Sequence, residues 1–154
     1  YLVRRTQEVE RSTGFFICRP FFIYFKIYNL IMKLLDFASS EYVILTTYKK
    51  DGTPVPTVVW IAQHKNYLVV TTSNNAGKVK RIRNNNKVSI CKTNRTGSKS
   101  LTEDYLAKGC EVLDKKEKLS GVNAIRNKYG SVGRAMTQGP MENRSILKIT
   151  ELAE

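Results

Sequence analysis

Hydrophobic and polar residues alternate in three short segments near the middle of the chain. The segments are YVILTTY (42–48), VPTVVWIA (55–62) and YLVVTT (67–72), and all are rich in β-branched and aromatic residues. This pattern is typical of strands that bury one face in a sheet. Asp51-Gly52 predicts a type I′ hairpin turn after the first strand, and His64-Lys65-Asn66 predicts a second turn. Strands joined in this way form an antiparallel sheet.

Three further strands and one longer helix are expected toward the C-terminus. Residues 87–93, 101–113 and 145–152 have the composition of strands. Apolar residues at helical spacing predict a helix over 115–129, capped by Asp114 and ended by Gly130. The residues expected to face the sheet are Leu119, Val122, Ile125 and Tyr129. The sequence therefore predicts a mainly β fold, a six-stranded antiparallel split β-barrel flanked by a short basic helix and one longer helix.

The short basic helix follows the third strand. Its N-cap is expected at Asn74 or Asn75, with Val79 and Ile82 facing the barrel and Lys80 and Arg81 pointing more outward. Cations in the first turn have the wrong sign for the helix dipole, at a cost of about 0.3–1 kcal/mol each when exposed. A bound phosphate would reverse this effect. From spacing alone, a phosphate site and a solvated basic helix are equally good interpretations. The cations are Lys78, Lys80, Arg81 and Arg83.

Two motifs in this region resemble those of a known family. They are TTYKKDGTPVPTVVW (46–60) and GKVKRIRNNNKV (77–88). Together they resemble the pyridoxamine-phosphate-oxidase-like superfamily of FMN-binding split barrels, especially its small FMN-dependent or deazaflavin-dependent members. Asn86 stands where a proline is common in that family. The matching positions are Thr47, Asp51, Gly52, Pro54, Thr57 and Trp60 in the first motif, and Lys78, Lys80, Arg81, Arg83, Asn85 and Val88 in the second.

The resemblance implies a flavin- or deazaflavin-dependent oxidoreductase that transfers hydride to or from an unknown small-molecule substrate. It also implies a homodimer with the cofactor at the subunit interface. FMN is the first expectation and the deazaflavin coenzyme F-420 is the alternative. An ordinary strand role for the threonines and a core role for the tryptophan remain alternatives. By this resemblance the cofactor is lined by Thr57, Trp60, Thr71 and Thr72, and its phosphate is held by Lys78, Lys80 and Arg81.

The sequence contains no recognisable catalytic constellation. The only histidine, His64, falls in an expected exposed turn, so a serine or cysteine nucleophile has no obvious base. No metal-binding motif is present, and catalytic residues are not assigned. A flavin enzyme needs few acid or base groups, because the cofactor carries the hard chemistry.

The positive charge leaves other classes of function open. The chain has 26 Lys and Arg against 13 Asp and Glu, a net charge of +13. Such a field attracts nucleic acid. The aromatic residues, however, lie within apolar strands and are not interleaved with the cations, as base stacking requires. A basic nucleic-acid-binding barrel and a non-catalytic flavin-binding protein are therefore the alternatives.

The expected domain organisation is an N-terminal extension over 1–31 and a split-barrel domain over 32–154. Residues 15–31 are apolar but are interrupted by Arg19, Pro20 and Lys26, which makes a poor membrane span. Three interpretations of 1–31 remain: a translated upstream region, a helix packed on the barrel, or a membrane-surface anchor. The first is favoured because the family resemblance begins at Met32. Cys18, Cys91 and Cys110 suggest no disulfide framework, so a reducing cytoplasmic location is expected.

Deletion of residues 1–31 is expected to leave folding intact, because the family resemblance covers only the rest of the chain. Thermal melting of the two proteins would test this. A truncated protein that is insoluble, or that melts far lower, would show that the apolar residues 15–31 belong to the core.

Overall fold

The structure is a computed structural model that describes residues 32–153, so the predicted extension over 1–31 lies outside the described residues. A mainly β fold with flanking helices is confirmed. The elements are η1 (Leu34–Ser39), β1 (Tyr42–Tyr48), β2 (Pro54–Trp60), β3 (Ala62–His64), β4 (Tyr67–Ser73), α3 (Gly77–Asn84), β5 (Lys87–Thr93), β6 (Tyr105–Glu111), α4 (Lys115–Met136), η2 (Met141–Asn143) and β7 (Arg144–Thr150).

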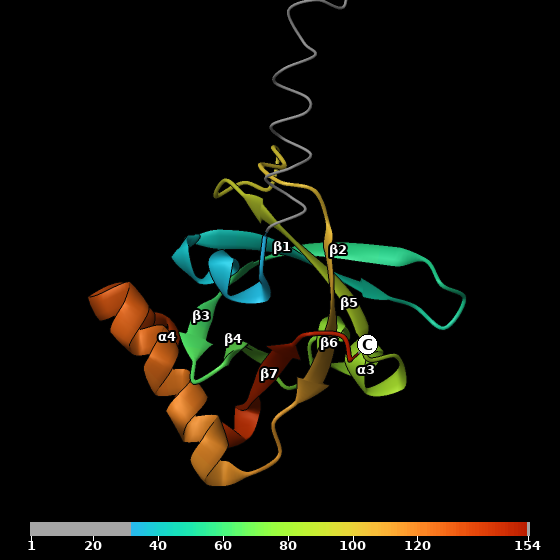
Figure 1. Cartoon of the computed structure of the whole chain (residues 1–154). Helices are drawn as coiled ribbons and strands as arrows, with labels where there is room; N and C mark the ends of the chain where they lie inside the picture. Colours follow the sequence, from blue (N-terminus) through green and yellow to red (C-terminus); the bar gives the residue numbers. More distant parts are fainter. Residues whose placement is uncertain (1–31, 154) are drawn as a thin grey trace, which may run out of the picture. The chain divides into compact units, whose positions relative to one another are not determined.

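All seven strands of this region form one antiparallel sheet in the order β2-β1-β5-β6-β7-β4-β3. The two strands at the ends of this order, β2 and β3, are consecutive in the sequence and separated only by Ile61. One continuous segment therefore pairs with β1 at its start and with β4 at its end, which curls the sheet into a barrel (Figure 1). The structure has seven strands instead of the expected six because the predicted strand 55–62 is broken at Ile61.

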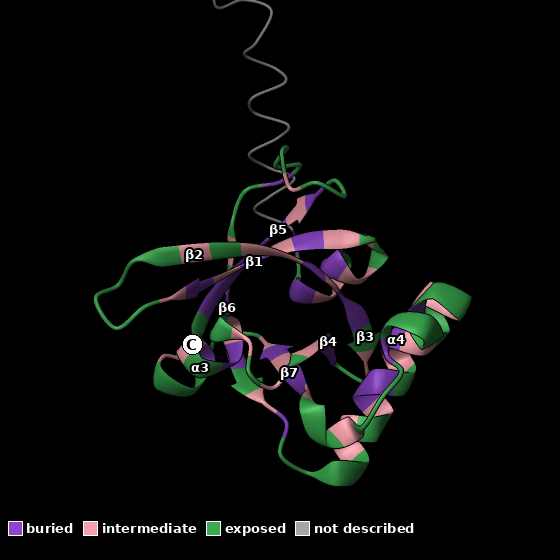
Figure 2. Ribbon diagram, turned by 180° about the vertical axis from the view of Figure 1, so that it is seen from behind, coloured by how far each residue is buried: buried purple, intermediate pink, exposed green. Residues whose placement is uncertain are grey.

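The strand alternation places one set of side chains inside the barrel. In β1, Val43, Leu45 and Thr47 are fully buried, whereas their neighbours are only partly buried. The register sets Leu45 opposite Ile90 of β5 and Thr57 of β2. Figure 2 shows the buried positions on the strands and on the sides of α3 and α4 that meet them. This core holds α3 across one end of the barrel.

The first hairpin has a different turn from the expected type I′. Of its central residues only Gly52 has a positive φ, of 85°. The Gly52 N–H donates to the carbonyl of Lys49 at 3.0 Å, and the Lys49 N–H donates to that of Thr53 at 2.9 Å. This is a type I turn followed by a left-handed glycine, which forms a bulge. The Asp51 carboxylate accepts the Thr53 N–H, and this hydrogen bond is the main cause that holds the pKa of Asp51 below its ordinary value.

The long helix begins at the predicted cap, since the Asp114 carboxylate accepts the Glu117 N–H at 2.8 Å. Gly130 leaves the helical conformation at φ 59° as expected, but six further residues continue the helix beyond this kink to Met136, although the sequence predicted that it ends at Gly130. Val122 and Ile125 are buried, but Leu119 is 47% exposed, contrary to prediction. Close packing of Gly121 against Ile146 brings the neighbouring side of the helix onto the sheet instead. Within the described region, no helix is long and apolar enough to span a membrane.

Two adjacent residues of α4 attach this helix to the break between β2 and β3. The Lys128 ammonium donates to the carbonyl oxygens of Ala38, Ser40 and Ile61, the last at 2.6 Å. The Tyr129 hydroxyl accepts the Ile61 N–H at 3.1 Å, and it donates to the Glu41 carbonyl. Burial lowers the pKa of Lys128 to about 8, and Glu41 opposes this shift. The backbone groups of Ile61 therefore bond to α4 instead of to a neighbouring strand.

Replacing Tyr129 by Phe is expected to lower the free energy of unfolding by about 1–3 kcal/mol, because the Ile61 N–H loses its acceptor. Chemical denaturation followed by circular dichroism measures this change. Tyr48→Phe is the matched control, since the Tyr48 hydroxyl makes no hydrogen bond to any described residue and its loss should change the stability by less than about 0.5 kcal/mol. Equal effects of the two substitutions would contradict the role of Tyr129.

Candidate functional site

The basic helix α3 packs against β6 and β1, and its residues Val79 and Ile82 are buried as predicted. Its N-cap is Ala76, which has no capping side chain, and not the expected Asn74 or Asn75. The Asn74 amide instead donates to the carbonyl of Glu142 at 2.8 Å. This asparagine is thus used to bind the segment before β7. The first turn of α3 is left without a side-chain cap.

Arg81 was expected to point outward, but its side chain does not. Its Nε donates to the hydroxyl oxygen of Thr47 at 2.7 Å, and Thr47 is fully buried at the end of β1. A Cβ added to Gly77 would lie 2.8 Å from the guanidinium Nη1 of Arg81. The guanidinium therefore lies back over the first turn of the helix, beside Gly77. The absence of a side chain at Gly77 leaves the space that it occupies.

Lys78 is half buried beside Arg81. Its ammonium donates to the hydroxyl oxygen of Thr72 at 3.3 Å. Burial lowers the pKa of Lys78, and the nearby positive charge of Arg81 lowers it further. Two threonines from different strands, Thr47 and Thr72, therefore hold two cations close together. We refer to Thr47, Thr72, Lys78 and Arg81 as the cation cluster.

The other candidate residues lie outside the cation cluster. Lys80 is exposed on α3 and makes no side-chain hydrogen bond within the described residues. Thr57 faces the inside of β2, opposite Leu45, whereas Trp60 lies three positions away and faces the other side of the strand. Trp60 stacks on the Tyr129 ring at 4.4 Å. Thr71 faces away from its neighbour Thr72, and its hydroxyl oxygen accepts a hydrogen bond from Arg144 at 3.1 Å.

The cation cluster has the properties of an anion-binding site. The first turn of α3 contains no acidic residue, and no described residue accepts the backbone N–H groups of Gly77 and Lys78. Unpaired N–H groups at a helix N-terminus and converging cationic side chains both favour a phosphate. Neither Lys78 nor Arg81 forms a salt bridge with a carboxylate in residues 32–153. The charge of the cluster therefore lacks a counter-ion in this part of the chain.

The C-terminal half of α3 is held by the carboxylate of Glu111, which was not among the residues predicted from the sequence. Glu111 at the end of β6 accepts two hydrogen bonds from Arg83, at 2.6 and 3.1 Å, and one from the Ser145 hydroxyl at 2.6 Å. Arg83 is therefore neutralised, unlike Lys78 and Arg81. The hydrogen bond from Arg83 is the main cause that holds the pKa of Glu111 below its ordinary value of 4.5; Ser145 adds to this shift, while burial opposes it.

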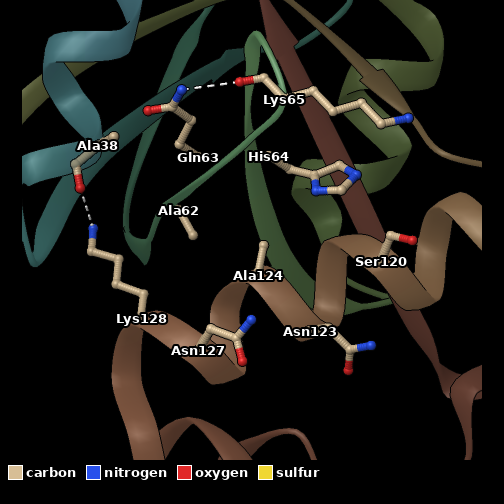
Figure 3. A pocket seen from close by; sticks show the side chains of 10 residues that line it. All are labelled: Ala38, Ala62, Gln63, His64, Lys65, Ser120, Asn123, Ala124, Asn127 and Lys128. Atoms are coloured by element: carbon tan, nitrogen blue, oxygen red, sulfur yellow. Dashed lines mark hydrogen bonds between the residues drawn. The ribbon is translucent and has the colours of Figure 1, made fainter.

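A cavity of about 740 Å³ runs along α4 beside β3, and its lining shares no residue with the cation cluster. His64 lines it and is half buried, although it was expected in an exposed turn. Its Nε2 has no hydrogen-bond partner among the described residues, and its ring meets Tyr67 edge to face. Figure 3 shows Lys128 reaching toward Ala38 and away from His64. No acid, base or nucleophile of the described region is hydrogen-bonded to His64.

Comparison with known proteins identifies the fold independently. The family described as pyridoxamine 5'-phosphate oxidase matches residues 32–151. No curated protein sequence matches the chain. Several solved structures share the fold at low sequence identity.

The heme storage protein HutZ from Vibrio cholerae has 17% identity and a TM-score of 0.60, over 80% of this chain and 93% of that protein. The conserved hypothetical protein Rv2991 from Mycobacterium tuberculosis has 17% identity and a TM-score of 0.60, over 80% and 82%. General Stress Protein 26 from Bacillus anthracis has 16% identity and a TM-score of 0.52, over 76% and 84%.

Glu111→Gln is expected to lower the stability at pH 7 by roughly 0.5–1 kcal/mol, a small effect because Arg83 is half exposed. Since the folded-state pKa of Glu111 is depressed, its contribution is present above pH 4.5 and is lost as the pH falls through the folded-state pKa. Denaturation curves between pH 7 and 3 should therefore converge for wild type and variant. Glu103→Gln, at an exposed position without hydrogen bonds in the described region, is the control. A constant difference at all pH values would contradict this assignment.

Proposed function

The chain belongs to the pyridoxamine 5'-phosphate oxidase family, and we propose that it binds FMN and acts as a flavin-dependent oxidoreductase on a small-molecule substrate. Members of this family commonly bind FMN. The deazaflavin F-420 is the alternative cofactor, since it also carries a phosphate. The free cysteines Cys91 and Cys110 are compatible with the cytoplasmic location that we propose.

The observation that carries the proposal is the uncompensated charge of the cation cluster. Lys78 and Arg81 lie beside each other at the N-terminus of α3, where a cation is unfavourable. A protein that only needed a stable helix at this point would be better served by an acidic or uncharged first turn. A phosphate reverses the sign of both unfavourable interactions, because it attracts the two side chains and the helix N-terminus.

The residues present fit a cofactor phosphate. The hydroxyl oxygens of Thr47 and Thr72 accept from Arg81 and Lys78, so both cations are positioned before the phosphate binds. The N–H groups of Gly77 and Lys78 and the ammonium of the exposed Lys80 add further donors. Thr57, on the inner face of β2, is the strand residue that we assign to the cofactor on the barrel side.

A bound flavin or deazaflavin supplies hydride transfer, and the protein supplies binding and orientation. Thr71 lies on the face of β4 opposite to Thr72 of the cation cluster. Trp60 lies on the face of β2 opposite to Thr57. In our proposal a second copy of the chain covers the cofactor, as the resemblance implies. The protein should then be a homodimer when the cofactor is bound, and size-exclusion chromatography with light scattering would measure this.

Lys78→Ala is expected to weaken FMN binding by about 1.5–3 kcal/mol, because it removes a charge-assisted hydrogen bond to the phosphate. Lys80→Ala should weaken it in the same direction. Lys115→Ala and Lys116→Ala are the controls, since both residues are exposed at the start of α4, and they should leave the affinity nearly unchanged. The measurement is a titration of FMN and of F-420 against each purified variant. Binding that survives the loss of both Lys78 and Lys80 would contradict the site.

The same four variants distinguish the nucleic-acid alternative. In a nucleic-acid-binding protein the cations act together as a distributed field, so all four substitutions would weaken oligonucleotide binding. Removing one cation that binds a phosphate would reduce the salt slope by about one unit. Reduction of the bound cofactor by a hydride donor, followed by absorbance, distinguishes an oxidoreductase from a protein that only holds the flavin.

A further inference from the structure

A second cavity, of about 550 Å³, lies where α4 passes the ends of three strands. Tyr42 at the start of β1 is opposite Trp60 at the end of β2 and opposite Thr93 at the end of β5. Arg95 follows two residues after Thr93, so the three strands bring these side chains to one place. The cavity is lined by Ser39, Glu41, Tyr42, Trp60, Arg95, Lys128, Tyr129 and Val132.

This cavity is separate from the cation cluster. Tyr42 and Thr47 stand toward opposite ends of β1, a separation that corresponds to roughly 17 Å along a strand. Binding in this cavity is therefore independent of the proposed cofactor site. A volume of this size is within the usual range for small-molecule sites.

The walls of the cavity are aromatic and held in place. The rings of Trp60 and Tyr129 are parallel within 9°, with centroids 4.4 Å apart. The Tyr129 hydroxyl is fixed by the Ile61 N–H and the Glu41 carbonyl, so the stack cannot turn freely. Tyr42 adds a third ring to the lining. Rigid aromatic side chains of this kind favour a flat ligand that stacks against them.

The charge of the cavity favours an anion over a cation. Lys128 lies 5.1 Å from the centre of the Tyr129 ring, where a cationic ligand would otherwise bind. The Lys128 ammonium bonds to three backbone carbonyls and, within the described region, to no carboxylate. Within residues 32–153, Arg95 has neither a hydrogen bond nor an ion pair, so its guanidinium is available. Glu41 is the single acidic residue among the lining residues, and two cations outweigh it.

We propose that this cavity binds a planar organic anion of the aromatic carboxylate class. The ring of the ligand lies against the wall formed by Trp60 and Tyr129, and its carboxylate pairs with the guanidinium of Arg95. Arginine is suited to this role because its planar fork matches a carboxylate through two hydrogen bonds.

The test uses the full chain and three related probes: 2-naphthoate, its neutral amide 2-naphthamide, and the saturated acid decahydro-2-naphthoate. Trp60 is the only tryptophan of the chain, so its indole N–H is a single NMR signal that reports on this cavity. We expect 2-naphthoate to shift that signal. Calorimetry should give an affinity at least about tenfold higher for 2-naphthoate than for either other probe.

Arg95→Gln should weaken 2-naphthoate binding by about tenfold or more, since it removes a charge-assisted pair. Lys99→Gln, which removes one charge from the same loop outside the cavity, should change the affinity by less than about twofold. The NMR spectrum of each variant verifies that it is folded. Absent binding, an unshifted Trp60 signal, equal affinity for the amide, or an unaffected Arg95→Gln variant would each overturn the proposal.

Discussion

The fold depends on how one segment passes from one side of the barrel to the other at Ile61. The peptide groups of Ile61 lie between two strand pairings, and buried peptide groups without partners are costly. Lys128 and Tyr129 of α4 supply those partners. The position of the long helix and the closure of the barrel are therefore one constraint. The hydrogen bonds of Tyr129 also fix the position of its ring, against which Trp60 stacks. This stack forms one wall of the cavity of about 550 Å³.

Closure of the barrel also explains why Lys78 and Arg81 of α3 can lie so close together. The end of β1 and the end of β4 are brought to the same helix, and each contributes a threonine hydroxyl, from Thr47 and Thr72. These hydroxyls hold Arg81 and Lys78 in place against their mutual repulsion. Glu111 neutralises Arg83 on the same helix, so carboxylate pairing is available in this part of the fold. Within the described residues, Lys78 and Arg81 lack such a partner, which supports our proposal that they bind an anion.

Strand alternation was enough to predict most of the sheet. The limits of β1 and β5 agree with prediction because both strands are followed by polar turn residues, although burial alternates only in β1. The break at Ile61 was missed, since its cause is a pair of hydrogen bonds from residues nearly seventy positions away. The outward position of Leu119 was missed for a similar reason, because it follows from the packing of Gly121 against Ile146 of β7. Local periodicity contains neither interaction.

The candidate residues were predictable by type but not by grouping. The basic composition of α3 and the family motif pointed to Lys78, Lys80 and Arg81, and the structure brings Lys78 and Arg81 together with Thr72. The separation of Trp60 from Thr57 follows from their spacing of three in a strand, which places them on opposite faces. Thr47 was part of the motif, but its hydrogen bond with Arg81 depends on a side chain that folds back along the helix. Rotamers of this kind are set by tertiary packing.

The most direct test of the account is a crystal structure of the protein grown with FMN. We predict that phosphate oxygens lie within about 3.2 Å of the Lys78 ammonium and of the backbone N–H of Gly77, with the Arg81 guanidinium alongside. FMN bound with its phosphate away from the N-terminus of α3 would contradict the central claim, and so would crystals that contain no FMN at a concentration well above that needed for binding in related flavoproteins.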